Sequence, residues 1–398
     1  MRVGIESLGV AFPSTYVELA ELAQARGVAP SKYLEGIGVR RMAVAGPDED
    51  TVTLAARAGR MALTTRQVDP ERVGLLVVGT ETAVDHSKPV ASFVQGLLGV
   101  GRRCRVFETK HACYGGTAAL QMALDWIRSS RAQGQKALII CSDIARYGLR
   151  TPGEPTQGAG AVALLVSSEP ALLELDGISG LCAVDVHDFW RPLYSKDAMV
   201  DGHYSVQCYL DALSGAYAHY QDQVGAKAGT GFSDRFSALA YHVPYGKMAR
   251  KAHRQLRMMD GDPDPDASFA RLVSPGLVLS EQIGNIYTGS LYLAVTSLLC
   301  STVEELASRE VGLFSYGSGC CAEFFTGVVQ PGAQERVRAL KLQEALDARR
   351  ALSIAEYEDI MRAREGLDEK PAARVSPDDF RFAGVEGHRR TYVAPASA

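Results

Sequence analysis

Short apolar runs alternate along the chain with segments whose apolar residues recur at helical spacing. In the first half, the segment 92–100 and the residues after Cys113 predict helices. Buried strands are predicted by the apolar runs at 73–79, 104–109, 136–143 and 160–168. Strands that alternate with helices indicate an α/β fold.

The second half repeats this order. A strand is expected over 237–243, followed by a helix rich in lysine and arginine. A glycine and a small-residue helix follow over 284–299, and a strand, a glycine turn and another strand over 311–329. We interpret this repetition as an ancient duplication of one α/β unit, with an N-terminal half at 1–169 and a C-terminal half at 170–398.

The remaining C-terminal sequence has a different character. Residues 331–365 show helical spacing, and Ser353 with Glu356 fits a capping box, so we expect solvated surface helices here. The tail after about residue 366 is polar and contains Pro371, Pro377 and Pro395, so it is expected to be partly extended.

Composition excludes several classes of function. The 398 residues are 46% hydrophobic and 22% charged with a formal net charge of -4, as in a globular protein without the basic patch that nucleic acid requires. No apolar run reaches the length of about 18 residues that predicts a membrane span, and the N-terminus reads as a strand instead of a secretion signal. The eight cysteines form no CxxC, so we expect reduced thiols, no metal site and a cytoplasmic protein.

The stretch KHACYGGTAALQMALDWI at 110–127 sets a cysteine just before a predicted helix. A helix N-terminus lowers the pKa of a nearby thiol, and Gly115 and Gly116 would let the backbone approach a bound acyl group. Main-chain N–H groups here could also hold a thioester oxygen. Cys113 is therefore either a nucleophile or a small buried apolar residue.

Two further residues stand at the ends of predicted strands. Glu81 in VVGTETAVDHSKP is either a loop residue or a general base at the carboxyl edge of a sheet, where α/β proteins bind ligands. His242 in YHVPYGKMARKAH precedes a basic helix that is either a solvated face or a site for the phosphates of a thioester such as coenzyme A. The positive charges on that helix are Lys247, Arg250, Lys251 and Arg254.

These stretches, taken with GEPTQGAGAVALLV, VDVHDFWRP, DGHYSVQCYLDAL, GNIYTGSLYL and SYGSGCCAEFF, resemble 3-hydroxy-3-methylglutaryl-CoA (HMG-CoA) synthases of the bacterial type. The resemblance extends from about residue 3 to about residue 360. It implies the thiolase fold, with two duplicated halves stacked as α-β-α-β-α layers, and a homodimer.

The resemblance also implies roles for individual residues. Cys113 matches the nucleophile that takes the acetyl group, Glu81 the base that removes a methyl proton, and His242 the histidine that assists at the ketone of the second substrate. Asn285 matches a hydrogen-bond donor to that substrate, and Ser318 a residue whose N–H completes an oxyanion hole with that of Cys113. Lys247 and Lys251 match lysines near CoA. Thr156 and Ser205 match lesser substrate contacts, and Asp143, Tyr147 and Asp188 match polar residues that support the site.

The implied reaction joins acetyl-CoA, acetoacetyl-CoA and water into HMG-CoA and CoA, in isoprenoid-type metabolism and without a metal or redox cofactor. A polyketide β-branching synthase acting on acyl carrier protein is the closest alternative, and the Cys320–Cys321 pair is shared with such enzymes. An initiating ketoacyl synthase would not need Glu81, and a non-catalytic thiol-rich scaffold would not need all three catalytic residue types. The short acidic segment DGDPDPDAS is expected to form a flexible loop at the entrance.

Overall fold

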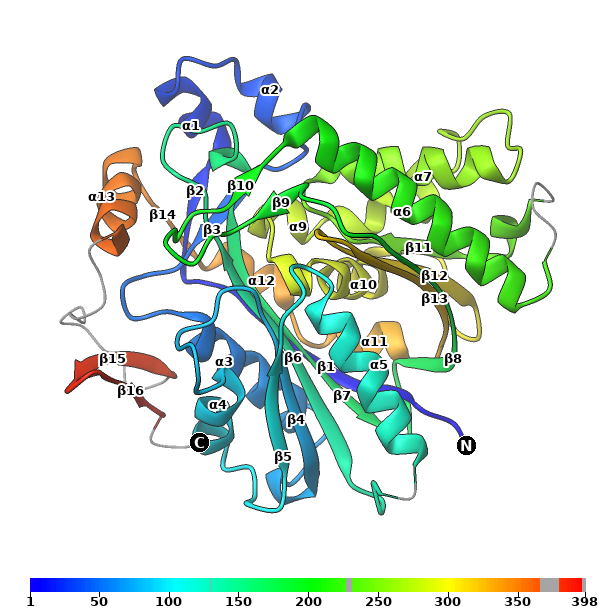
Figure 1. Cartoon of the computed structure of the whole chain (residues 1–398), viewed down its shortest axis with the longest axis horizontal. Coiled ribbons are helices and arrows are strands. Elements are labelled where there is room, and N and C mark those ends of the chain that lie inside the picture. The colour runs from blue at the N-terminus through cyan, green and yellow to red at the C-terminus, as the bar shows by residue number, and fades with distance from the viewer. Residues whose placement is uncertain (130, 227–230, 366–378, 396–398) are drawn as a thin grey trace.

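The structure is a computed structural model and describes residues 1–129, 131–226, 231–365 and 379–395. Its main element is a mixed sheet of nine strands, to which both halves of the chain contribute (Figure 1). In sheet order the strands are β11 (Ala238–Tyr241), β12 (Glu310–Gly317), β13 (Cys321–Val329), β8 (Leu173–Ala183), β1 (Gly4–Ala11), β7 (Gly158–Ser167), β6 (Lys136–Ala145), β4 (Val73–Gly79) and β5 (Arg105–Thr109).

The strand order confirms the duplication. In the first half β4 pairs parallel with β6, which continues antiparallel through β7 to β1. In the second half β11 pairs parallel with β12, which continues antiparallel through β13 to β8. A short contact between β1 and β8, at Gly4 opposite Glu174, joins the two sheets into one. Glu81 and His242 therefore follow equivalent strands, β4 and β11.

Helices cover the two sheets in three layers, which confirms the thiolase-type arrangement (Figure 1). Helices α3 (Thr51–Thr64) and α4 (Val90–Leu98) pack on the outer face of the first sheet, and α6 (Gly202–Gln223) and α7 (Gly246–Met259) lie outside the second. Helices α5 (Gly115–Arg128) and α10 (Ser290–Ser301) lie between the sheets. All ten residues of β6 and of β7 are buried, as expected for strands covered on both faces.

Two smaller sheets and several short helices complete the body. A three-stranded sheet combines β2 (Thr15–Glu18), β3 (Arg41–Val44) and β14 (Arg350–Ala351), next to α1 (Leu19–Ala25) and α2 (Pro30–Leu34). A two-stranded hairpin combines β9 (Phe189–Trp190) and β10 (Met199–Val200). The short helices of the second half are α8 (Phe269–Leu272), α9 (Ser280–Ile283), α11 (Ala333–Arg338), α12 (Leu342–Asp347) and α13 (Ile354–Glu365).

The C-terminal region is more integrated than the sequence predicts. The capping box is confirmed, because the Ser353 N–H donates to Glu356 Oε2 at 2.8 Å and the Glu356 N–H donates to Ser353 Oγ at 3.3 Å. The expectation of solvated surface helices is wrong for one face, since Tyr357 is fully buried and Glu358 forms an ion pair with Arg26 at 2.7 Å. The helical spacing indicated a helix but not its partner, because Arg26 lies 332 positions away from Glu358 in the sequence.

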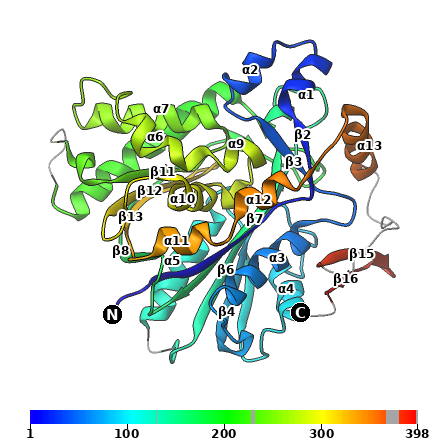
Figure 2. The ribbon, with the colours of Figure 1, turned by 180° about the vertical axis from the view of Figure 1, so that it is seen from behind.

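After residue 378 the chain forms a β-hairpin of β15 (Arg381–Glu386) and β16 (Arg389–Val393) beside α3 and α4 (Figure 2). Arg390 and the Tyr392 hydroxyl both contact the Asp50 carboxylate at the start of α3. Residues 366–378, which include Pro371 and Pro377, lie outside the described residues, so the expectation of a partly extended tail stays a prediction there.

The expected boundary between residues 169 and 170 falls in the connection from β7 to β8 and stays a prediction. Within the described ranges, no helix combines the length and apolar character that crossing a membrane requires.

Candidate active site

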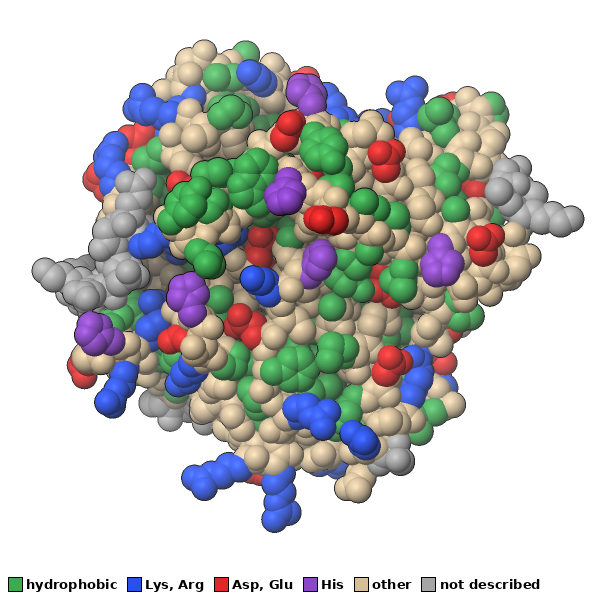
Figure 3. Space-filling view, in the orientation of Figure 1, with side chains coloured by type: hydrophobic (Ala, Val, Ile, Leu, Met, Phe, Trp, Pro, Cys, Tyr) green, Lys and Arg blue, Asp and Glu red, His purple; other side chains and the backbone are tan. Residues whose placement is uncertain are grey.

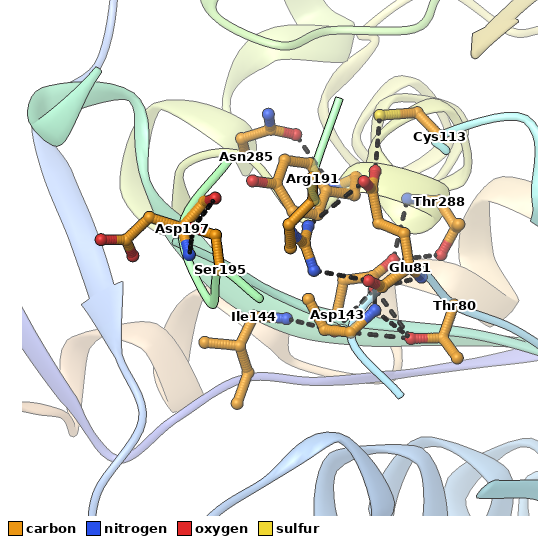
Figure 4. A network of polar contacts seen from close by, with 12 residues as sticks. Thr80, Glu81, Cys113, Asp143, Ile144, Arg191, Ser195, Asp197, Asn285 and Thr288 are labelled. Atoms are coloured by element: carbon orange, nitrogen blue, oxygen red, sulfur yellow. Dashed lines mark hydrogen bonds and ion pairs between the residues drawn. The ribbon is translucent and has the colours of Figure 1, made fainter. Parts of the chain in front are cut away.

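Cys113 and Glu81 meet between the two sheets. The Cys113 thiol donates to Glu81 Oε1 at 3.2 Å (Figure 4). Glu81 follows β4, and Cys113 lies in the loop between β5, which pairs with β4, and α5. Ala112 in this loop has a φ of +38°, in the left-handed region that non-glycine residues rarely adopt. The parallel β4–β5 pair and this unusual turn bring the thiol and the carboxyl group together.

Burial controls the protonation of both groups. Burial raises the pKa of the Glu81 carboxyl to about 8, with a further contribution from the nearby Asp143 carboxylate. Burial and then the Glu81 carboxylate raise the pKa of the Cys113 thiol well above its ordinary value. The pKa of the thiol is therefore not lowered as expected from a helix N-terminus: α5 begins only at Gly115, and burial together with the Glu81 carboxylate raises the pKa.

The glycines after the cysteine serve packing. A Cβ at Gly116 would lie 2.3 Å from the sulfur of Cys141 on β6, so α5 can approach the sheet this closely only with glycine. Whether Gly115 and Gly116 also make room for an acyl group stays a prediction. At Gly317, a Cβ would lie 2.6 Å from the Tyr114 nitrogen, so the turn of Ser318 packs directly against the Cys113 loop.

Asp143, at the end of β6, connects the Glu81 loop to the second half of the chain. It is fully buried, and Oδ1 accepts the Glu81 N–H at 2.9 Å. Oδ2 accepts the Thr288 N–H at 3.1 Å and lies 2.5 Å from its hydroxyl. Thr80 and Thr82 supply the other donors to Oδ1. Asp143 therefore supports the main chain around the predicted base, as its predicted role requires.

Arg191 completes the surroundings of Glu81, and the sequence did not single it out. Its Nη1 donates to the Glu81 carbonyl oxygen at 2.6 Å, and its Nη2 lies 3.3 Å from Glu81 Oε2 (Figure 4). Its guanidinium lies 5.8 Å from the centre of the Tyr287 ring. Tyr147 lies nearby and is half-buried, and loss of solvent around its hydroxyl followed by the charge of Cys113 raises the pKa of that hydroxyl. The quoted motif VDVHDFWRP contained Arg191, but nothing in it indicated contact with Glu81.

Asp188, Ser205 and the Ser318 turn form a second polar group. Asp188 is fully buried, and its Oδ2 accepts the Tyr316 hydroxyl at 2.7 Å and the Ser205 hydroxyl at 3.1 Å. Its Oδ1 accepts the Gly319 N–H at 3.0 Å. The carboxylate thus ties α6 to the turn between β12 and β13. Ser205 faces Asp188, and whether it also contacts substrate stays a prediction.

His242 and Asn285 are both buried, and their roles stay predictions. Burial lowers the pKa of His242 to about 3, so its imidazole is neutral around pH 7. Asn285 Oδ1 accepts the Tyr287 N–H and the Ser290 hydroxyl, both at 2.9 Å. Its Oδ1 is therefore occupied by the local turn, which leaves the Nδ2 group to meet a substrate.

The basic side chains of α7 differ in whether a carboxylate lies near them. Arg250 and Arg254 lie 3.5 Å and 4.0 Å from the Asp266 carboxylate in largely exposed pairs, and the phosphate-binding role expected for this helix stays a prediction. Lys247 and Lys251 have no carboxylate within ion-pair distance among the residues that the structure describes. Asp262 also pairs with Arg257, which attaches the start of the acidic segment to α7, and the expected place of this segment at the entrance stays a prediction.

Thr156 lines a cavity of about 680 Å³ close to this helix. Its hydroxyl donates to the Gly153 carbonyl at 2.8 Å. The cavity wall also includes Lys32, Arg150 and Tyr245, the residue that precedes α7. The Lys247 N–H donates to the Ile37 carbonyl, which places the start of α7 against the same wall. Lys32 was missed because the sequence around it carries no motif.

Family models, related sequences and solved structures all indicate the same family for this chain. The family model for the N-terminal part of hydroxymethylglutaryl-coenzyme A synthase matches residues 1–171, and the model for its C-terminal part matches 173–270 and 265–378. A hydroxymethylglutaryl-CoA synthase of Enterococcus faecalis is 41% identical, over 90% of this chain and 91% of that protein. The polyketide biosynthesis 3-hydroxy-3-methylglutaryl-ACP synthase PksG of Bacillus subtilis is 36% identical, over 90% and 87%.

Solved structures agree. The structure of MvaS in complex with 3-hydroxy-3-methylglutaryl coenzyme A superimposes with a TM-score of 0.93 at 49% identity, covering 99% of both chains. The HMG synthase of the curacin biosynthetic pathway superimposes with a TM-score of 0.91 at 33% identity, covering 99% and 100%. The chain belongs to the hydroxymethylglutaryl-CoA synthase family, and it is an HMG-CoA synthase.

Proposed function

We propose that this enzyme condenses free acetyl-CoA with acetoacetyl-CoA through an acetyl thioester on Cys113, with Glu81 as the base. The observation that carries the proposal is the 3.2 Å contact of the Cys113 sulfur with Glu81 Oε1 in a partly buried site. A methyl group attached to that sulfur through a thioester lies next to the same carboxylate. Covalent capture therefore converts proton removal into a step between groups already in contact.

In the first half-reaction the Cys113 sulfur attacks the acetyl carbonyl of acetyl-CoA. The new bond joins this sulfur to the acetyl carbon, the bond to the CoA sulfur breaks, and CoA leaves as a thiol with the proton that Cys113 loses. The N–H groups of Cys113 and Ser318 are the donors we propose for the carbonyl oxygen, supported by the close packing of the Gly317 turn on the Cys113 loop.

In the second half-reaction Glu81 removes a methyl proton, and the carbanion attacks the ketone of acetoacetyl-CoA. A base with a pKa of about 8 combines useful strength with partial ionisation near neutral pH. His242 is neutral at that pH, so it donates a hydrogen bond to the ketone oxygen but does not deliver a proton from an imidazolium. We assign the proton for the new alkoxide to Glu81, which has just gained one. Water then hydrolyses the Cys113 thioester and releases HMG-CoA.

The substrates that we propose are free CoA thioesters instead of acyl carrier protein. The MvaS structure contains HMG-CoA, and another HMG-CoA synthase structure, with 35% identity, contains CoA. In this chain, the cations of Lys247 and Lys251 are not neutralised by a carboxylate among the described residues, beside the cavity of Thr156 and Lys32. Cations in this position suit the phosphates of CoA.

The test separates the half-reactions and the two substrate classes. Intact-protein mass should show one acetyl group added by acetyl-CoA to the wild type and none to Cys113→Ala. Glu81→Ala should still become acetylated but should not form HMG-CoA. Matched acyl groups on CoA and on carrier protein should be compared in the same assay. Turnover only with the carrier protein would reject free CoA as the substrate and would leave the roles of Cys113 and Glu81 standing.

None of the proposed steps is an oxidation or a reduction, because they are acyl transfer, proton transfer, addition of a carbanion to a ketone, and hydrolysis. We therefore propose that no metal or redox cofactor is required, and turnover should survive dialysis against a chelator. We also propose a cytoplasmic location, supported by eight cysteines that are all free thiols.

We further propose a homodimer. Leu193 and Tyr194, at the tip of the β9–β10 hairpin, are 92% and 87% exposed, and apolar side chains gather over this hairpin (Figure 3). Exposed apolar clusters of this kind often mark interaction sites. Sedimentation equilibrium should give twice the chain mass for the wild type, and a monomer at micromolar concentration would contradict the proposal.

A further inference from the structure

Arg191 contacts Glu81 in a way that suits control of the base. Its two terminal nitrogens bind different parts of the same residue, the main-chain carbonyl at 2.6 Å and the carboxylate Oε2 at 3.3 Å. The other carboxylate oxygen, Oε1, accepts the Cys113 thiol. The two oxygens therefore have separate partners, and the carboxylate plane is held with Oε1 toward the nucleophile (Figure 4).

We propose that Arg191 is a positioning residue that favours the ionised form of the Glu81 carboxylate and directs it at the acetyl group during condensation. The inference rests on the proposed role of Glu81 as the base. It goes beyond that role because it assigns a task to a residue outside the three catalytic positions, contributed by the other half of the chain.

Acetylation makes Arg191 more important. Once Cys113 carries an acetyl group its sulfur has no proton, so the hydrogen bond to Glu81 Oε1 is lost. Among the described residues, Arg191 is then the remaining cation beside this carboxylate, and Asp143 adds a negative charge nearby. Arg191 should therefore matter much more for condensation than for acetylation.

The other titratable groups around Glu81 do not replace Arg191. Burial and like charge raise the pKa of the Tyr147 and Tyr287 hydroxyls, so both stay neutral and supply no positive charge. Within the described part of the chain, Arg146 forms no hydrogen bond or ion pair with Glu81, and it lies near Arg191 as a second cation. The groups that face Glu81 are thus Cys113 before α5, Asp143 on β6, Tyr147 after β6, Arg191 after β9 and Tyr287 in the turn before α10.

The surroundings of Arg191 also hold its side chain in place. Its Nε is buried without an acceptor in the described part of the chain, an unfavourable state that is rare without a functional reason. Phe189 packs edge-on against the rings of Tyr147 and Tyr287, at 6.4 Å and 5.9 Å between centroids, and so fixes the start of the hairpin. The guanidinium is thereby directed at Glu81.

The test uses Arg191→Met, Arg191→Lys and a matched control, Arg235→Met. Arg235 also pairs with a glutamate, Glu310 at 2.6 Å, and also lies over an aromatic ring, that of Phe232 at 5.0 Å. It lies just before β11, away from the strand end that carries His242. Acetyl-enzyme formation is followed by intact-protein mass, and condensation by a single turnover of preformed acetyl-enzyme with acetoacetyl-CoA, from pH 6 to pH 10.

In Arg191→Met we expect the acid limb of the condensation profile to move to higher pH by about one unit, with about a tenfold loss at pH 7. Acetylation should change by less than about threefold, because that step does not need an ionised Glu81. Arg191→Lys keeps the charge but not the planar fork of the guanidinium. The acid limb of its condensation profile should therefore stay in place while its maximal rate of condensation falls. Arg235→Met should match the wild type in both half-reactions.

An equal loss at every pH, or an equal loss in both half-reactions, would overturn the proposal, because a purely structural role predicts those results. If Arg191→Met does not fold, the Arg191→Lys variant tests the proposal. An acid limb of its condensation profile that is displaced to higher pH would overturn the proposal. Glu81→Gln separates this inference from the proposed function. Condensation by Glu81→Gln would reject Glu81 as the base, whereas an unshifted limb in Arg191→Met with inactive Glu81→Gln rejects only the role of Arg191.

Discussion

Replacing Glu81 by glutamine should make the folded protein more stable at alkaline pH while it abolishes condensation. The carboxyl group has a pKa of about 8 in the folded protein against 4.5 ordinarily, with burial as the main cause. Between these values the folded state binds more protons than the unfolded state. Stability therefore falls as pH rises from about 4.5 to about 8.

The size of the effect follows from the same two values. Each pKa unit corresponds to about 1.4 kcal/mol, so ionised Glu81 costs the folded state about 5 kcal/mol above pH 8 and about 3 kcal/mol at pH 7. Glutamine has nearly the same shape and can accept the Arg191 hydrogen bond, but it does not ionise. The free energy of unfolding of Glu81→Gln should therefore exceed that of the wild type by these amounts, and the difference should vanish near pH 4.5.

Urea unfolding at pH 5, 6, 7 and 8.5, at one protein concentration, measures this difference. Glu344→Gln is the control, because Glu344 on α12 is exposed and forms its ion pair with the exposed Lys341. Its difference from the wild type should not depend on pH. A pH-independent gain for Glu81→Gln, or a loss that grows with pH, would show that burial does not hold the proton on Glu81.

Three other predictions concern the same site. The rate of condensation by preformed acetyl-enzyme should rise about tenfold per pH unit below about 8 and then level off, and a flat rate from pH 6 upward would contradict Glu81 as the base. Asp143→Ala removes the acceptor of six hydrogen bonds and should lower the free energy of unfolding by about 3–5 kcal/mol, so a loss below about 1 kcal/mol in urea would be incompatible with the network. The double variant Lys247→Gln with Lys251→Gln should raise KM for acetyl-CoA about tenfold or more with little change in kcat. Arg254→Gln, whose partner is Asp266, should not do so, and equal effects in both would remove the distinction between the two sets of charges.

Much of the fold could be predicted because its signals are local. Strands such as β4 and β6 are continuous apolar runs, and the repeated order of strand, helix and strand revealed the duplication. The capping box of Ser353 and Glu356 could also be predicted, because its hydrogen bonds join residues only a few positions apart. The motifs around Cys113 and Glu81 were long enough to identify the family.

The contacts that decide the chemistry could not be predicted in the same way. Arg191 lies 110 positions from Glu81, and only the stacking of the two halves brings them together. The salt bridges of Arg250 and Arg254 with Asp266 likewise depend on how the acidic segment folds back on α7. The burial of Tyr357 and the docking of the C-terminal hairpin on α3 depend on surfaces contributed by distant segments.

The sequence by itself determined the main elements and their duplicated order, because these depend on residue type and short spacing, and its motifs identified the family from which the roles of Cys113, Glu81 and His242 are proposed. The tertiary structure alone decided their protonation. A helix N-terminus predicts a low thiol pKa, yet Cys113 is held above its ordinary value. The physical reason is that desolvation and like charge depend on every atom packed around a group, and those atoms come from both halves of the chain.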